Sequence, residues 1–159
     1  MEQLTLFAPP YKYIIDSSSI FSQKPDEPHR RRVYKGQWQR IDECIRDQLI
    51  VTCSEIEAEI KDKDLVDWLH QQQCVVLPIT DEIQENVRKI VNEHPNLIDF
   101  GKCKSSGDAF LIATAMAHHL TVITEQNPDS PKKIPFICRT YGIPCVNITE
   151  LSEAEHWEF

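Results

Sequence analysis

Short apolar runs alternate along this chain with segments of helical periodicity. Runs of apolar, mostly β-branched residues predict strands, over residues 11–15, 49–52, 75–77, 120–124 and 145–148. Apolar residues spaced three and four apart predict helices, over residues 38–49, 54–61, 64–70, 81–91 and 109–119, with a short one ending near Gly142. This alternation predicts an α/β fold with three layers (α/β/α), in which helices cover both faces of a mostly parallel sheet of about five strands. We expect a single domain over residues 1–159.

Several boundaries carry local signals. Asp16 and the three serines after it predict a polar turn at the end of the first strand, and a long loop is expected over residues 23–35. Thr80 stands where a helix cap is expected before residue 81. Ser54 with Glu57, and Ser105 with Asp108, match the capping-box spacing. The segment 109–119 is apolar nearly all round, which predicts a buried helix.

The net charge is −8, from 25 acidic and 17 basic residues. Such a balance argues against a protein that holds nucleic acid by bulk attraction to phosphate, so any RNA or DNA contact must be local. No apolar run is long enough to span a bilayer, and no signal peptide precedes the first strand, so we expect a cytoplasmic protein without membrane contact.

Glycine and cysteine exclude further classes of function. With only four glycines, neither a P-loop nor a dinucleotide-binding fingerprint can be written. The six cysteines contain no C-x-x-C pair, and most lie in apolar stretches where a thiol acts as a small hydrophobe.

Acidic residues follow the predicted strands. They are Asp16 after the first strand, Glu55 and Glu59 on the helix after the second strand, Asp108 at the start of the buried helix, and Glu125 after the fourth strand. In open α/β sheets, ligands bind outside the carboxyl ends of the strands. Carboxylates gathered there repel one another unless a hard cation such as Mg²⁺ or Mn²⁺ binds between them. By helical position, Glu59 borders the buried stripe and is the better ligand candidate, with Glu55 more exposed on the same face.

Each acid also has an ordinary structural interpretation. Asp16 could form a turn or cap the next helix, Asp108 could complete a capping box, and Glu125 could be a solvated loop charge. The recurrence of a carboxylate at each expected position favours a shared site.

Four motifs carry a family resemblance: YIIDSSSIF, SEIEAEI, GDAFLIATAMA and TVITE, in this order. Together they resemble the PIN-domain ribonucleases. The closing segment KKIPFICRTYGIPCVNITEL is similar to a subgroup related to the VapC-type toxins of bacterial toxin–antitoxin pairs. The resemblance implies a PIN-like domain in which Asp16, Glu59, Asp108 and Glu125 form the acidic metal-binding and catalytic set. Ser18 stands where the family often has Asn, and Thr124 would line the same site.

The fourth acid departs from the family pattern. Members often carry it two residues beyond the threonine, where this chain has Gln126, whereas Glu125 is one residue beyond and Asp129 is five. Asp129 is therefore an alternative fourth ligand, and Glu55 is an alternative second one.

These groups would permit metal-assisted hydrolysis of RNA phosphodiesters without a protein nucleophile. Positive charge for the substrate phosphates could come from Lys102, Lys104, Lys132, Lys133 and the run Arg30, Arg31 and Arg32. By resemblance the partners would be RNA, a cognate antitoxin and, in some arrangements, a second copy of the chain. The main alternative is a noncatalytic PIN-like binding protein with an incomplete metal site.

Overall fold

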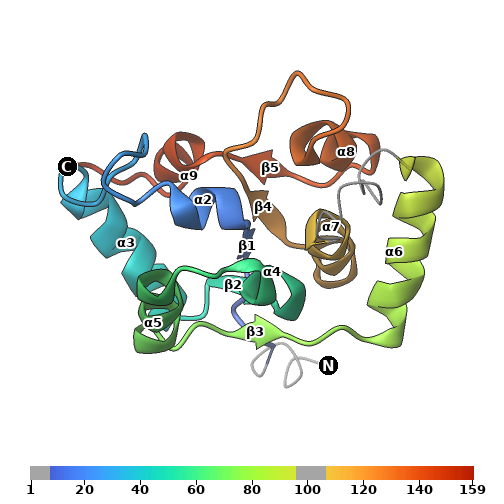
Figure 1. Ribbon diagram of the computed structural model, residues 1–159, viewed down its shortest axis with the longest axis horizontal. Coiled ribbons are helices and arrows are strands. Elements are labelled where there is room, and N and C mark those ends of the chain that lie inside the picture. Colours follow the sequence, from blue (N-terminus) through green and yellow to red (C-terminus); the bar gives the residue numbers. More distant parts are fainter. Residues whose placement is uncertain (1–7, 96–106) are drawn as a thin grey trace.

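The computed structural model describes residues 8–95 and 107–159. In this part the strands form one parallel sheet in the order β3-β2-β1-β4-β5 (Figure 1). The strands are β1 (Tyr13–Ile15), β2 (Ile50–Cys53), β3 (Val76–Leu77), β4 (Thr121–Ile123) and β5 (Cys145–Val146). Tyr13 lies opposite Ile50 on one side and Thr121 on the other, so β1 is the central strand. The predicted α/β class is confirmed.

Helices cover both faces of the sheet. They are α2 (Ser17–Phe21), α3 (Lys35–Arg46), α4 (Ser54–Glu59), α5 (Lys63–Gln71), α6 (Asp81–Glu93), α7 (Gly107–His118), α8 (Ile134–Thr140) and α9 (Ile148–Ala154). In Figure 1, α3, α5 and α9 lie on one side of the strands and α6, α7 and α8 on the other. The strands are all parallel and their carboxyl ends meet at one edge, where α2 follows β1 and α4 follows β2.

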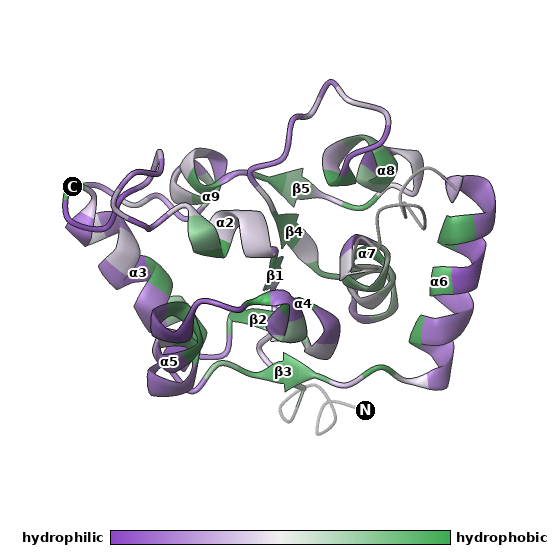
Figure 2. Cartoon of the chain, viewed as in Figure 1, coloured by the Kyte–Doolittle hydropathy of each residue, from purple (hydrophilic) through white to green (hydrophobic). Residues whose placement is uncertain are grey.

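The core lies between the sheet and its helices. Strand residues such as Ile14, Ile15 and Val122 are fully buried, as are Leu111 and Ile112 of α7, which confirms the predicted buried helix. Figure 2 shows hydrophobic residues along the strands and hydrophilic ones on the outer helices α3, α5 and α6. No helix in the described ranges is long and apolar enough to cross a membrane.

Two helix starts differ from the predictions. Residues Ser17–Phe21 form the helix α2 directly after β1, where a polar turn was expected. The capping box predicted at Ser54 does not form, because Ser54 is already helical and Cys53, which has no capping side-chain oxygen, precedes it. The predicted Thr80 cap is confirmed, since its side chain accepts a hydrogen bond from Ile83 N. Ser105 lies outside the described residues.

The last strand is shorter than the predicted run 145–148, and a helix follows it. β5 stops at Val146, and Asn147 caps α9 through a capping box with Glu150. Each side chain of the pair accepts a hydrogen bond from the backbone N–H of the other, at 2.8 and 2.9 Å. The N-I-T-E spacing was a usable signal for this start, but the apolar run 145–148 concealed it.

Candidate metal and RNA site

Asp16 lies at the carboxyl end of the central strand and is almost fully buried, with 1% of its surface exposed. Its backbone N–H donates to Ile123 O at 2.9 Å, which joins the ends of β1 and β4. It stands at the N-cap position of α2, yet its side chain makes no capping hydrogen bond. The carboxylate therefore faces its neighbours at the strand ends.

Two hydroxyl groups hold this carboxylate. Ser18 Oγ donates to Asp16 Oδ2 at 2.7 Å, and Thr124 Oγ1 donates to the same oxygen at 3.0 Å. Each hydroxyl oxygen in turn accepts a backbone N–H, from Glu125 to Ser18 and from Gln126 to Thr124. The two hydroxyl oxygens also lie 3.1 Å from each other, so Ser18, Thr124 and Asp16 form one connected hydrogen-bond network. Both residues named as support in the sequence thus contact the first acid.

The electrostatics of this position disfavour the charged carboxylate. Burial and, after it, the charge of Asp108 raise the pKa of Asp16 from 3.8 to about 6, although the hydrogen bonds from Ser18 and Thr124 act in the opposite direction. Asp108 comes from α7, so two acids far apart in the sequence lie within electrostatic reach of each other.

Glu59, the last residue of α4, approaches the same place from another side. Ser17 Oγ lies 3.4 Å from Glu59 Oε2 and 3.5 Å from Asp16 Oδ1, so one hydroxyl lies between the two carboxylates. Glu55 lies one turn earlier, beside Cys53: burial raises the pKa of that thiol to about 11, and the Glu55 charge contributes to the rise. Of the two glutamates, Glu59 is the one near Asp16.

Gly107 makes room for the Glu59 carboxylate. A Cβ atom at this position would lie 1.9 Å from Glu59 Oε1 and 2.5 Å from its Cδ. Only a residue without a side chain allows the carboxylate to rest against the start of α7. This role of Gly107 was not predicted, although the G-D pair opening α7 in a chain with four glycines was a usable signal.

Gln126 contacts Asp108. Its Nε2 donates to Asp108 Oδ2 at 3.1 Å, and its Oε1 accepts the backbone N–H of Ile134 at 2.9 Å. The start of α8 therefore fixes the orientation of the amide, so that its N–H₂ group faces the acid. The position where the PIN-domain resemblance implies an acid is thus occupied here by a neutral donor.

Glu125 turns away from this network. Its Oε1 accepts the backbone N–H of Ile148 at 3.0 Å and lies 3.3 Å from His29 Nε2. The carboxylate thereby joins the start of α9 to the long loop after α2. Asp129 is exposed, and its backbone N–H donates to Asn127 Oδ1. Asp16, Glu59 and Asp108 are brought together, whereas the carboxylate of Glu125 is engaged elsewhere.

Arg31, one of the predicted RNA-contact residues, makes several contacts within the protein. Its guanidinium donates to both carboxylate oxygens of Asp42, at 2.9 and 3.0 Å, and to Gln23 Oε1. It also lies over the rings of Trp38 and Trp68, at 5.3 and 5.5 Å from their centroids. These internal contacts give Arg31 a structural role in joining the loop to α3 and α5, and its contact with RNA stays a prediction.

The other basic candidates differ in exposure. Arg32, Lys132 and Lys133 are exposed, and Lys133 directly precedes α8. Arg30 is half-buried and donates to Glu27 O. Lys102 and Lys104 lie outside the described residues.

Comparison with known families assigns the chain. A family model described as "Domain of unknown function (DUF4411)" matches residues 13–159. The chain belongs to the DUF4411 family. No curated protein matches it.

Solved structures share the fold of this DUF4411 protein. FitAcB from Neisseria gonorrhoeae matches with a TM-score of 0.52 and 18% identity, over 86% of this chain and 98% of that one. VapBC2 from Rickettsia felis, bound to a DNA fragment from their promoter, matches with a TM-score of 0.53 and 14% identity, over 85% and 97%. PAE2754 from Pyrobaculum aerophilum matches with a TM-score of 0.51 and 14% identity, over 91% of this chain and 96% of that one. The PIN-like fold expected from the sequence is confirmed.

The donor chemistry of the DUF4411 site fits a hard divalent cation. Asp16, Glu59 and Asp108 supply carboxylate oxygens, and hard cations prefer oxygen ligands. Within residues 8–95 and 107–159, however, no three His, Cys, Asp or Glu side chains are arranged as a metal-binding group. The Ser17 hydroxyl between two of the acids, and the Gln126 amide on the third, show what occupies the spaces between them.

Proposed function

We propose that this DUF4411 protein is a metal-dependent ribonuclease and the toxin component of a toxin–antitoxin pair. The observation that carries the proposal is Asp16, a buried carboxylate whose pKa is raised by burial and by the charge of Asp108. No Lys, Arg or His side chain in the described ranges forms an ion pair with it. A site that keeps such a group in place is suited to a cation from outside the chain.

Asp16, Glu59 and Asp108 are the residues that would hold Mg²⁺ or Mn²⁺, and the carboxylates would draw together as they do so. A bound divalent cation lowers the pKa of a coordinated water and offsets negative charge on phosphodiester oxygens. Ser18 and Thr124 keep Asp16 oriented, and Gln126 does the same for Asp108. Glu125 has a structural task at the start of α9 in this arrangement, so we propose three acidic ligands and not four.

The structural neighbours support a protein partner. The chain shares its fold with a chain of FitAcB and a chain of VapBC2, and its closing segment resembles the VapC-type toxins of toxin–antitoxin pairs. A cognate antitoxin that covers the acids or the basic residues around them would hold the nuclease in check.

RNA cleavage by the purified protein, with Mg²⁺ or Mn²⁺ and with EDTA as the blank, tests the activity. We expect Asp16→Asn and Asp108→Asn each to reduce the cleavage rate by at least about 100-fold, since metal sites of this kind supply several kcal/mol of transition-state stabilisation. Asp26→Asn, at an exposed loop position, is the matched control and should retain the full rate. Unchanged cleavage in both site variants would exclude the proposed centre.

A noncatalytic RNA-binding protein is the second candidate function. The Gln126 amide on Asp108 favours it, because a neutral donor occupies the place where a further ligand would complete the site. In this case the protein would bind RNA in a filter-retention assay but would leave it intact with either metal.

A further inference from the structure

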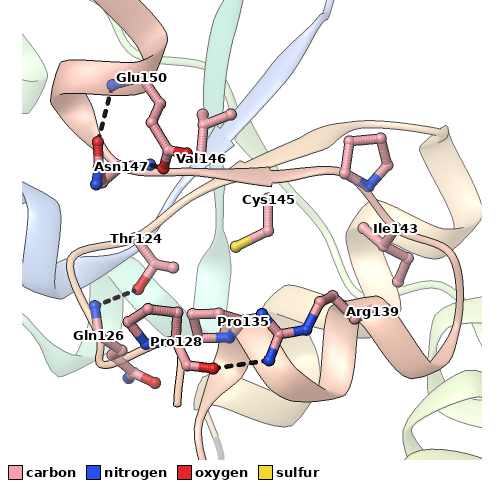
Figure 3. A pocket seen from close by; sticks show the side chains of 11 residues that line it. Thr124, Gln126, Pro128, Pro135, Arg139, Ile143, Cys145, Val146, Asn147 and Glu150 are labelled. Atoms are coloured by element: carbon pink, nitrogen blue, oxygen red, sulfur yellow. Dashed lines mark hydrogen bonds between the residues drawn. The ribbon is translucent and has the colours of Figure 1, made fainter.

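A cleft of about 390 Å³ with both polar and apolar lining opens beside the acids, between β5, α8 and the loop that follows β4 (Figure 3). Thr124 and Gln126 belong to its lining. They are the same residues that contact Asp16 and Asp108. A molecule in the cleft would therefore lie next to the proposed site of cleavage, and the volume is in the range of small-ligand pockets.

The walls of the cleft suit a flat ring. Pro128, Pro135 and Pro144 contribute rigid apolar faces, and Ile143 and Val146 add to them. Such walls bury the faces of an aromatic ligand while leaving its edges to polar groups.

Opposite charges lie across the cleft. Figure 3 shows Arg139 on the side of Pro128, Glu150 on the side of Asn147, and the Cys145 sulfur between them. A hydrogen bond with Cys138 lowers the pKa of the Cys145 thiol, and the charges of Glu150, Asp16 and Arg139 also act on it. These charges therefore meet around one point in the cleft, with Asp16 in reach of it.

Both charged groups keep hydrogen-bonding capacity. The Arg139 guanidinium donates from Nη2 to Pro128 O at 2.7 Å and lies 5.8 Å from the centroid of the Phe136 ring, and this side chain makes no other hydrogen bond in the ranges 8–95 and 107–159. Glu150 uses Oε1 for the backbone N–H of Asn147, which leaves Oε2 available. The cleft thus presents donors on one side and a carboxylate oxygen on the other.

We propose that this cleft binds a guanine base, that of a nucleotide adjoining the phosphodiester that is cut; the inference rests on the proposed ribonuclease function. Guanine offers acceptors at O6 and N7 to an arginine and donors at N1 and N2 to a carboxylate. Adenine places a bare acceptor, N1, where guanine has a donor, and it would face Glu150. Pyrimidines lack the second ring that fills the space between the proline walls.

Binding of free mononucleotides to the full chain in EDTA tests the cleft without any cleavage. By calorimetry or NMR titration we expect GMP to bind at least about fivefold more tightly than AMP, CMP or UMP, the lower end of discrimination by a charged pair. Glu150→Gln keeps the oxygen that accepts from the Asn147 N–H but removes the negative charge. Arg139→Lys keeps the positive charge but removes the paired N–H donors of the guanidinium. Both should weaken GMP binding at least about fivefold while AMP changes little.

Matched controls separate the cleft from general charge. Glu153→Gln lies on the same helix α9, and Arg40→Gln lies on α3, where the side chain is half exposed. Both should bind GMP as the wild type does. Equal affinity for all four mononucleotides, or equal losses in the control variants, would overturn the guanine assignment.

Cys145 supplies a second readout. Among the described cysteines it has a lowered pKa, whereas the pKa values of Cys44, Cys53, Cys74 and Cys138 are raised, so alkylation at neutral pH should favour Cys145. GMP should slow its labelling by iodoacetamide at least about fivefold, scored on the tryptic peptide by mass spectrometry, and AMP should not.

The two proposals can fail separately. Cleavage of RNA without preference for a guanosine beside the cut, together with no GMP protection of Cys145, would leave the nuclease standing and remove the base pocket. Selective GMP binding by a protein that cleaves no RNA with either metal would keep the base pocket and remove the nuclease.

Discussion

The two sides of the candidate site differ in the charge of the side chains that face the acids. On the β1 side, Asp16 is buried, held by the hydroxyls of Ser18 and Thr124, and left without an ion-pair partner in the described part of the chain. On the side of the loop after β4, Glu125 is used at α9, and the residue that reaches the acids is the neutral Gln126. One side concentrates negative charge, and the other limits it. Charge at this sheet edge is thus set residue by residue.

The largest effect concerns the charge of Asp16 itself. In the unfolded chain its carboxyl ionises near pH 4, but in the folded chain only near pH 6, so the unfolded chain loses its proton first. The contribution of Asp16 to the free energy of unfolding therefore falls as pH rises from about 4 to 6. With no metal present, Asp16→Asn should abolish this fall and raise the stability at pH 7.5 by up to about 3 kcal/mol.

Urea unfolding in EDTA at pH 4.5 and pH 7.5 measures this difference. Asp62→Asn is a control of opposite sign, because the ion pair with Lys24 lowers the pKa of Asp62, while Asn can still cap α5. It should not stabilise the protein at pH 7.5. An Asp16→Asn protein with the wild-type pH dependence would show that the strand end does not disfavour the charge.

Gly107 allows the Glu59 carboxylate to be displaced without touching the acids. In Gly107→Ala the new Cβ overlaps Glu59 Oε1, and the flexible end of the glutamate must move away. Ala is favoured over Gly in a helix by about 1 kcal/mol, so we expect the stability to change by no more than about that amount. Mn²⁺ affinity, measured by calorimetry, should fall about tenfold, equivalent to about 1.4 kcal/mol.

Gly142→Ala is the complementary control. Gly142 has a φ of +69° and open space around its Cα, so a side chain there strains the backbone without meeting a neighbour. This variant should lose about 1 kcal/mol of stability and keep the wild-type Mn²⁺ affinity. Parallel losses of stability and affinity in both variants would contradict a specific role for Gly107.

The sequence was informative where position along a strand decides the outcome. Asp16, Glu59 and Asp108 were found because the carboxyl ends of parallel strands share one edge, and because helical phase favoured Glu59 over Glu55. The sequence did not predict the direction in which a side chain at a given position points. Glu125 and Gln126 are neighbours in the chain, yet one faces Ile148 and His29 and the other faces Asp108.

Aromatic and arginine residues show the same limit. The run of three arginines was a candidate RNA contact, but the Arg31 guanidinium packs over the rings of Trp38 and Trp68, which come from two different helices. The sequence around residues 30–32 does not predict this packing, because it depends on how α3 and α5 pack against each other. Tertiary packing therefore decided which arginine is structural.

The smallest expected effect exchanges the roles of the neighbours Glu125 and Gln126. Gln126→Glu keeps an oxygen for Ile134 N–H but replaces the donor to Asp108 by a second carboxylate. Repulsion between the two should lower the metal-free stability at pH 7.5 by about 1 kcal/mol, and Mn²⁺ affinity should rise severalfold because the cation relieves it. In the matched variant Glu125→Gln an oxygen remains for Ile148 N–H, so Mn²⁺ affinity should stay unchanged. If Glu125→Gln instead loses Mn²⁺ binding while Gln126→Glu gains none, the cation is held by the glutamate at 125, and the division of the site into a charged and a neutral side is wrong.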